Sequence, residues 1–347
     1  MNKYLKVLGA FFLFGSLIAC ATPTPVPTQV PTITPTVEVV TDNSLHLGNW
    51  HDMFYHEELE HVILVNGGPE SGKPGTDPLE LWSWNGRQWS LLSADPSGPH
   101  WRNFASSAYD SNRDVLVLYG GLTEGKNYND TWEWDGETWT QFPVEGPGSR
   151  ESAGMTFDES RNKVVLFGGA QSGKPMNDIW EWDGRQWTQI PAAEGPDARF
   201  PAGFVYDAAN RYVLLFGGHA IENDKVKTFS DTWTWNGLNW EEIEVKGPSA
   251  RDGARAIFYP VHNQVFLFGG AEIANKVKNL NDTWLWNGTQ WQHVEVDGPT
   301  ARVHPAMAFD QKRSLIVMTG GSTGPDAILA DTWEWDGEAW VCKSECK

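Results

Sequence analysis

A cluster of three tryptophans with the pattern W-x-W-[DN]-G-x-x-W recurs six times in this 347-residue chain. The six copies begin at Trp82, Trp132, Trp180, Trp233, Trp284 and Trp333. Each copy follows a Gly-Gly pair that ends an apolar run, and successive pairs lie about 50 residues apart, a period typical of repeated supersecondary units. The chain is therefore expected to fold as an array of six similar units.

The third unit shows the pattern that all six share. Strands are expected at Ala153–Phe157, Val164–Phe167, Ile179–Trp182 and Trp187–Ile190, and the second is a continuous apolar run, as expected of a strand covered on both faces. Every unit carries Asn-Gly or Asp-Gly before its last strand, which favours a type I′ hairpin turn with positive φ at both central residues. Four antiparallel strands repeated six times predict an all-β fold, a six-bladed β-propeller whose tryptophans fill the spaces between blades.

The double glycine, the W…W spacing and the period resemble Kelch repeats, which also build the propeller domain of galactose oxidase. The resemblance covers about residues 45–342 and implies four-stranded Kelch-like blades there, with 343–347 as a C-terminal tail. Kelch propellers host binding proteins, isomerases and oxidases, so the function stays open. The copper site of galactose oxidase needs a Tyr–Cys crosslink, and the cysteines here lie near the ends of the chain, so a copper oxidase is not expected. The D-G-x-x-W spacing also departs from the sialidase Asp-box S-x-D-x-G-x-x-W, so a sialidase is not expected.

The N-terminal segment predicts export. Residues 1–19 begin with Lys3 and Lys6 and continue with an apolar run too short to span a membrane, which is typical of a signal peptide. The run ends in Leu-Ile-Ala before Cys20, which resembles a bacterial lipobox and implies lipidation of Cys20; the alternative is an ordinary signal with a chance cysteine. Residues 20–44 are rich in Thr and Pro, so we expect an extended linker that holds the propeller off the membrane, in the cell envelope and facing the periplasm or the exterior. A short outer strand at 37–41 that helps to close the ring is an open alternative.

Composition narrows the chemistry further. The formal net charge of −19 argues against a nucleic-acid partner. The sequence has no nucleotide-binding loop, no H-E-x-x-H, no EF-hand run and no Cys/His zinc spacing, so neither a cofactor nor a metal is expected. In an exported protein Cys342 and Cys346 are expected to form a local disulfide, with a zinc pair as the weaker alternative.

One face of the propeller is expected to carry the site. The Gly-Gly loops and the G-P-x-x-R segments between units fall on the same face and are the longer, more variable loops. Five units repeat an arginine at a fixed distance before the Gly-Gly pair and an aspartate two residues before the first tryptophan. The arginines are Arg102, Arg150, Arg199, Arg251 and Arg302. Bidentate Arg–carboxylate pairs that tie the scaffold together are one interpretation; a cationic ring that binds ligand carboxylates is the other.

Residues that break the repeat are the better functional candidates. Trp50 and Trp101 are the two tryptophans outside the repeated cluster, and both flank the arginine position, where they predict stacking on a sugar or clamping of a peptide; caps over the core are the alternative. Other departures near the same face form a possible ligand-binding or acid–base set, against the simpler view that a water-filled channel is polar. This set consists of His51, Asp52, Glu151, His219, Asp252, Arg255 and His304. The catalytic candidates among them are Arg255, Glu151 and His304.

These features favour a membrane-tethered, extracytoplasmic binding module for a carbohydrate or a protein partner. A sugar isomerase that resembles periplasmic Kelch sialic-acid mutarotases and uses the channel mouth is one alternative. A structural surface scaffold is the other.

Overall fold

The computed structural model describes Leu45, Leu47 and residues 51–66, 75–123, 126–191, 194–223, 225–273, 276–324 and 327–346. All of them belong to one compact unit, Val39–Lys347. The predicted signal peptide 1–19, Cys20, the linker 20–44, the alternative strand at 37–41 and Trp50 lie outside the described residues. Within the part that is described, no helix is long and apolar enough to cross a membrane.

Six four-stranded antiparallel sheets form the blades, and the four strands of each blade follow one another within a single segment of the chain. Blade 1 consists of β1 (Asp52–His56), β2 (His61–Asn66), β3 (Glu80–Trp84) and β4 (Trp89–Ser93), and blade 2 of β5 (Ser106–Asp110), β6 (Val115–Tyr119), β9 (Thr131–Trp134) and β10 (Trp139–Phe142). Blade 3 consists of β11 (Gly154–Asp158), β12 (Lys163–Phe167), β15 (Ile179–Trp182) and β16 (Trp187–Ile190), and blade 4 of β17 (Gly203–Asp207), β18 (Tyr212–Glu222), β19 (Lys225–Trp235) and β20 (Trp240–Glu242). Blade 5 consists of β21 (Arg255–Tyr259), β22 (Gln264–Phe268), β25 (Thr283–Trp286) and β26 (Trp291–Val294), and blade 6 of β27 (Ala306–Asp310), β28 (Leu315–Thr319), β29 (Thr332–Trp335) and β30 (Trp340–Ser344).

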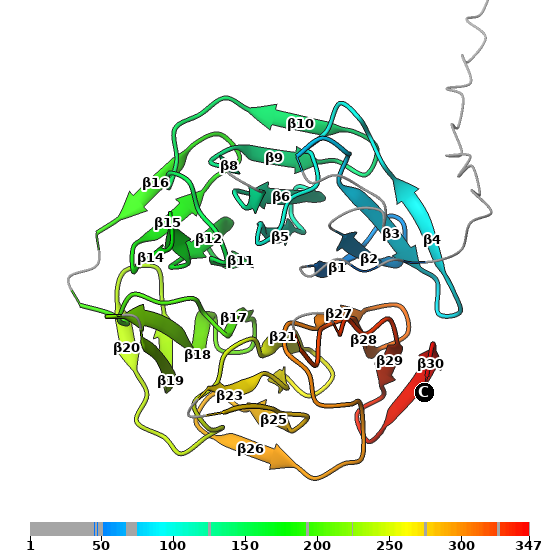
Figure 1. The fold of residues 1–347 in the computed structure, drawn as a ribbon, viewed down its shortest axis with the longest axis vertical. Coiled ribbons are helices and arrows are strands. Elements are labelled where there is room, and N and C mark those ends of the chain that lie inside the picture. Colours follow the sequence, from blue (N-terminus) through cyan, green and yellow to red (C-terminus); the bar gives the residue numbers. More distant parts are fainter. Residues whose placement is uncertain are drawn as a thin grey trace, which may run out of the picture. The chain divides into compact units, whose positions relative to one another are not determined.

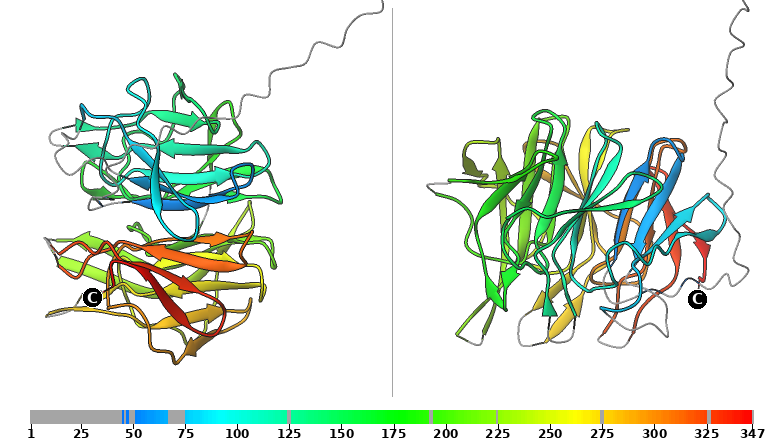
Figure 2. Two further views of the ribbon diagram at one scale, coloured as in Figure 1. Left: turned by 90° about the vertical axis from the view of Figure 1, so that its right-hand side faces the viewer. Right: turned by 90° about the horizontal axis from the view of Figure 1, so that it is seen from above.

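The blades stand around a central axis, with the first strand of each innermost and the fourth outermost (Figure 1). The strands run along the axis, so the turns gather on two opposite faces (Figure 2). The second strand of a blade is covered on both sides: Val164, Val165, Leu166 and Phe167 of β12 are all 0% exposed, which explains their continuous apolar run. The prediction of a six-bladed propeller with four-stranded blades is confirmed.

Among the described strands, none is shared between the first and the last blade where the ring closes. β27 of blade 6 packs against β1 of blade 1, and one buried cluster joins Met53 and Val62 of blade 1 to Ala308 and Val317 of blade 6. Close to this seam the Gly321 N–H donates to His51 Nε2 over 3.2 Å. At four other junctions the corresponding glycine N–H donates to the main-chain carbonyl of an arginine, for example Gly169 to Arg199. At this seam the His51 side chain is therefore the hydrogen-bond acceptor for the glycine N–H, in place of the arginine main-chain carbonyl at the other four junctions.

Indole hydrogen bonds join the blades at alternate junctions. In blades 1, 3 and 5, the second and third tryptophans of the repeated cluster donate their indole N–H groups to the preceding blade, over donor–acceptor distances of 2.7–3.0 Å. The donor–acceptor pairs are Trp84–Glu334, Trp89–Thr332, Trp182–Glu133, Trp187–Thr131, Trp286–Tyr212 and Trp291–Thr232. Among the described residues, Trp134, Trp139, Trp235, Trp240 and Trp340 of blades 2, 4 and 6 have buried indole nitrogens without a partner. The indole bonds thus group the blades as 6–1, 2–3 and 4–5.

The hairpin turns of the tryptophan cluster differ from the type I′ turn that the sequence predicts. Trp84 pairs directly with Trp89, so four residues form the loop, and Gly86 has a positive φ of 91° while Asn85 does not. The Asn85 side chain instead organises the turn, because its Oδ1 accepts from the N–H groups of Arg87 and Gln88. The prediction of positive φ at both central residues was wrong, since an Asx-type turn satisfies the backbone with one left-handed residue.

The Gly-Gly loops build small hairpins on the opposite face. Three are separate two-stranded sheets: β7 (Leu122–Thr123) with β8 (Lys126–Asn127), β13 (Ala170–Gln171) with β14 (Lys174–Pro175), and β23 (Ala271–Ile273) with β24 (Val277–Asn279). In blade 4 the hairpin is continuous with the long strands β18 and β19, and it contacts both β14 and β23. The hairpins of blades 3 to 5 therefore form one continuous side of this face, called here the loop-rich face.

Candidate functional site

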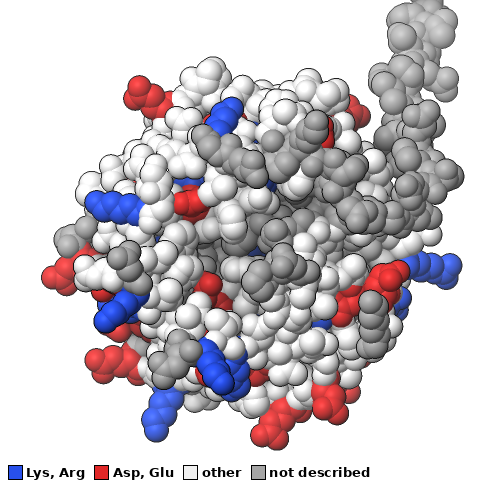
Figure 3. Space-filling view, in the orientation of Figure 1, with Lys and Arg blue, Asp and Glu red and all other residues white. Residues whose placement is uncertain are grey.

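The six innermost strands surround a cavity of about 310 Å³ along the propeller axis. Its wall combines small and apolar side chains such as Ala108, Ala256 and Met155 with polar and charged ones such as Ser107 and Arg255. Seen in the orientation of Figure 1, the centre of the ring is hollowed and charged side chains lie mostly around the rim (Figure 3). A volume of this size is at the lower end of the range for small-ligand pockets.

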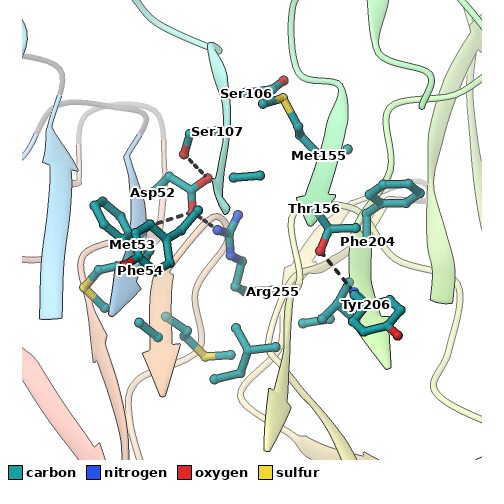
Figure 4. Close-up of a pocket in the computed structure, with 18 of the residues that line it drawn as sticks. Asp52, Met53, Phe54, Ser106, Ser107, Met155, Thr156, Phe204, Tyr206 and Arg255 are labelled. Carbon is teal, nitrogen blue, oxygen red and sulfur yellow. Dashed lines mark hydrogen bonds and ion pairs between the residues drawn. The ribbon is translucent and has the colours of Figure 1, made fainter. Parts of the chain in front are cut away.

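An ion pair crosses the cavity between Arg255 and Asp52. Strand register, counted from the repeated tryptophans, puts both residues at the same position of the innermost strand, in blades 5 and 1. Blade 6, which lies between these two blades, carries the small residue Ala306 at that position. Ser107 of blade 2 donates to the second carboxylate oxygen of Asp52 at 2.7 Å (Figure 4). Burial lowers the pKa of Arg255 to about 10, which still leaves the guanidinium charged at neutral pH.

A second polar group lies where the loop-rich face meets the cavity. His219 Nδ1 lies 2.8 Å from Asp252 Oδ1, and the His219 ring stacks on Phe200 with ring centroids 4.6 Å apart. Burial acts to raise the pKa of Asp252, but His219 and His304 outweigh it, so this pKa is lowered and the carboxylate is ionised. Burial lowers the pKa of His304, only partly opposed by Asp252, so His304 is neutral at pH 7. An ionised acid beside the neutral imidazole of His304 can accept and donate protons or bind hydroxyl groups.

The five repeated arginines are buried inside their own blades. Each is at most 3% exposed and is bound to the aspartate of the same blade, as in the bidentate pair of Arg251 with Asp282 at 2.6 and 2.9 Å. Each also donates to the carbonyl of the first glycine of its Gly-Gly pair, and the aspartate accepts from the first tryptophan of the cluster. The aspartate partners of Arg102, Arg150, Arg199 and Arg302 are Asp130, Asp178, Asp231 and Asp331. These guanidinium groups hold loops to strands and are not presented to a ligand in this structure.

Two further candidates are engaged in local structure. Glu151 accepts from the Gly173 N–H at the tip of the β13–β14 hairpin at 3.1 Å. Trp101 exchanges backbone hydrogen bonds with Gly75 and Asp77 of the first Gly-Gly loop, its side chain is half-buried, and it is not part of the cavity wall. The structure therefore brings Asp52, Arg255, His304, His219 and Asp252 together and leaves Glu151 and Trp101 apart from them.

Comparison with known families agrees with this architecture. The family model described as the KLHDC2/KLHL20/DRC7 Kelch-repeats domain matches residues 51–236, more than half of the chain. The chain belongs to this Kelch-repeat family. Kelch propellers commonly bind protein partners, and this membership suggests a protein-interaction module.

One curated relative matches part of the propeller. The Kelch propeller is similar to Mei4-dependent protein 6 of Schizosaccharomyces pombe (strain 972 / ATCC 24843), with 30% identity over 113 residues. The match covers 29% of this chain and 16% of that protein, so the chain spans a small part of the relative's length.

Comparing the repeats of this Kelch propeller with one another missed two residues that contact members of the candidate set. Ser107 and Phe200 contact Asp52 and His219, but serine and phenylalanine give no pattern at these positions that would single them out. The pairing of Asp52 with Arg255 was missed for a different reason. In blade 1 one more residue lies before the Gly-Gly pair than in blade 5, because β2 has six residues where β22 has five. A count back from the Gly-Gly pair therefore places Asp52 one position away from the equivalent of Arg255.

Cys342 and Cys346 form a disulfide at the end of β30. Among the described residues of the Kelch propeller, no three His, Cys, Asp or Glu side chains cluster so as to hold a metal ion.

Proposed function

We propose that this chain is a lipid-anchored, extracytoplasmic Kelch module whose loop-rich face binds a protein partner. The signal-like residues 1–19, Cys20 and the Thr/Pro-rich linker 20–44 support the anchored setting. Family membership supports an interaction role. The loop-rich face is favoured over the opposite one because its hairpins differ from blade to blade, whereas the turns of the opposite face repeat.

The exposure of apolar side chains on neighbouring hairpins is the observation that favours the loop-rich face. The β18–β19 hairpin of blade 4 exposes a cross-strand pair, Ile221 at 47% and Val226 at 45%. The neighbouring β23 contacts β19, and its partner β24 exposes Val277 at 66%. The corresponding hairpin tips of blades 2 and 3 carry polar residues such as Lys126 and Lys174. Exposed apolar side chains gathered on projecting hairpins of neighbouring blades are a feature of protein interaction sites.

Photo-crosslinking in the native envelope tests this assignment. A photoreactive residue at position 221 or 277 is expected to capture the same protein, whereas position 238, an exposed leucine on the opposite face, is expected to capture none. The partner is then purified, and Ile221→Ser is expected to weaken its binding while Leu238→Ser does not. Capture from position 238 alone, or equal binding by both variants, would reject the loop-rich face.

The lipid anchor has its own test. Labelling with a fatty-acid analogue is expected to mark the full-length chain, and Cys20→Ser is expected to abolish the label and release the protein from the membrane fraction. A Cys20→Ser chain that remains in that fraction would contradict the anchor without affecting the interaction role.

The His219–Asp252 contact and the neighbouring His304 favour a second candidate, carbohydrate binding or sugar isomerisation at the cavity. A ligand at a hundred times its dissociation constant adds about 2.7 kcal/mol of stability, so a thermal-shift screen with neutral and acidic sugars detects it. A sugar that shifts the melting temperature of the parent protein but not of Asp252→Asn would support this candidate. No shift with any sugar would leave the protein-binding role.

A further inference from the structure

The tryptophan hairpins occur in two chemical versions that share one geometry. Three units have Asn-Gly and three have Asp-Gly at the turn. In the Asn turns, Oδ1 of Asn85, Asn236 and Asn287 accepts two backbone N–H groups at 2.9–3.1 Å. In the Asp turns, Oδ1 of Asp135, Asp183 and Asp336 accepts the same two at 2.8–3.0 Å. The fold thus shows both an amide and a carboxylate in this place.

We propose that Asn85, Asn236 and Asn287 are sites of spontaneous deamidation in the native propeller, and that each turn accepts the aspartate product. The chemistry needs only water. The glycine amide nitrogen gives up its proton and attacks the asparagine Cγ, so that a C–N bond forms. The Cγ–Nδ2 bond breaks, and the side-chain nitrogen leaves with that proton as ammonia to give a succinimide. Water then opens the ring, and the chain is left with aspartate or with isoaspartate, according to which carbonyl is attacked.

Three features of the turn favour attack on the asparagine side-chain amide. The following residue is glycine, so no Cβ shields the attacking nitrogen. The two N–H groups on Oδ1 polarise the side-chain carbonyl and stabilise the negative charge that develops on this oxygen when nitrogen attacks, as in an oxyanion hole. Asn85, Asn236 and Asn287 are exposed, so water reaches them.

The same N–H groups favour the product. Backbone donors at Ala339 and Glu338 lower the pKa of Asp336. For Asp135 and Asp183 burial acts to raise the pKa, but backbone donors outweigh it and the pKa is lowered. These turns therefore bind a carboxylate more strongly than its neutral form, as expected for charge-assisted hydrogen bonds. Isoaspartate, by contrast, inserts a methylene into the main chain between paired tryptophans and is expected to disturb the hairpin.

Peptide mapping by mass spectrometry tests the proposal on the full-length protein. After incubation at neutral pH, the peptides that contain Asn85, Asn236 and Asn287 are expected to show the mass gain of an amide converted to a carboxylate. Asn129, Asn177 and Asn281 are matched controls, because they are exposed but are followed by aspartate, and they are expected to remain intact. Conversion of the controls at the same rate, or conversion in the urea-unfolded chain but not in the native protein, would overturn the proposal.

Stability of the product is tested separately. The single variants Asn85→Asp, Asn236→Asp and Asn287→Asp are expected to fold with a melting temperature at neutral pH equal to or above that of the parent. A lower melting temperature in all three would show that the turns do not accept the product. The hairpins lie on the face opposite to the loop-rich face, so the outcome is independent of partner binding.

Discussion

At the residue scale, the buried arginines are expected to be the most sensitive polar positions of the fold. Arg251 is 0% exposed and its guanidinium joins Asp282 to the Gly269 carbonyl. Removing one member leaves the other charge without its partner, so Arg251→Met is expected to cost about 3 kcal/mol of unfolding free energy in urea titrations. Lys278→Met is the matched control, because Lys278 is 70% exposed and lies 3.7 Å from Glu272; its effect should stay within about 0.5 kcal/mol.

The same pairs set a pH dependence. Burial acts to raise the pKa of Asp282 and Asp331, but the arginine bound to each outweighs it and lowers the pKa. Because the folded pKa is the lower one, the pairs stabilise the propeller above the ordinary Asp pKa of about 3.9, and this contribution is lost as the pH falls through the folded value. Urea midpoints measured across this acidic range should decline, and Arg251→Met should lose less stability over the range than the parent. Equal slopes would argue against the pair as the cause.

Single glycines at the blade crossovers are required for steric reasons. A Cβ on Gly247 would lie 2.6 Å from Cδ1 of Trp291 in the outer strand of blade 5. Gly247→Ala is therefore expected to cost about 1–3 kcal/mol, the range for overpacking, in thermal or urea unfolding. Gly324→Ala is the control, since nothing lies within 4 Å of its added Cβ. A neutral Gly247→Ala would mean that the tryptophan moves aside freely.

At the element scale, the indole bonds predict which strands hold the blades together. Thr131→Val removes the acceptor of the Trp187 indole and leaves a buried N–H unpaired, so it is expected to cost about 1–3 kcal/mol. Thr283 occupies the equivalent position in blade 5 but its buried hydroxyl has no partner in the described structure. Thr283→Val should therefore be neutral or stabilising. Equal losses for the two variants in urea titrations would show that the hydroxyl, and not the bond, determines stability.

Sequence alone predicted the elements well and their connections less well. The six tryptophan clusters and apolar runs gave the number of blades and the strands, because each β-strand of a propeller is determined by local pattern and burial. The hydrogen bond from the Gly321 N–H to His51 Nε2 at the ring closure joins residues 270 positions apart, and no local sequence pattern indicates it. The ion pair of Asp52 with Arg255 likewise depended on strand register across blades, which a count from the Gly-Gly pair misplaced by one residue. Deciding between a scaffold role and a ligand-binding role for the repeated arginines required knowing that they are buried, and their repetition in the sequence does not show this.

At the scale of the whole molecule, the alternate bonding predicts an order of opening. Among the residues that the structure describes, no indole hydrogen bond joins blades 1 and 2, 3 and 4, or 5 and 6, in contrast to the other three junctions. Hydrogen exchange in mild urea should therefore reach the outer strands β10, β20 and β30 before β4, β16 and β26. Exchange that is uniform around the ring, or fastest at the junction between blades 6 and 1, would contradict this order.

The grouping of blades also bears on where the chain can be cut and rejoined. Blade 6 comes last and blade 1 first along the described chain, so no crossover segment joins them, and the indoles of Trp84 and Trp89 bridge this junction. A circular permutant that links β30 to β1 and opens the crossover between β4 and β5 would keep all three bonded pairs of blades on continuous chain. One opened between β10 and β11 would interrupt the pair formed by blades 2 and 3. The two-blade pair is thus the piece of this propeller that should tolerate rearrangement as a whole.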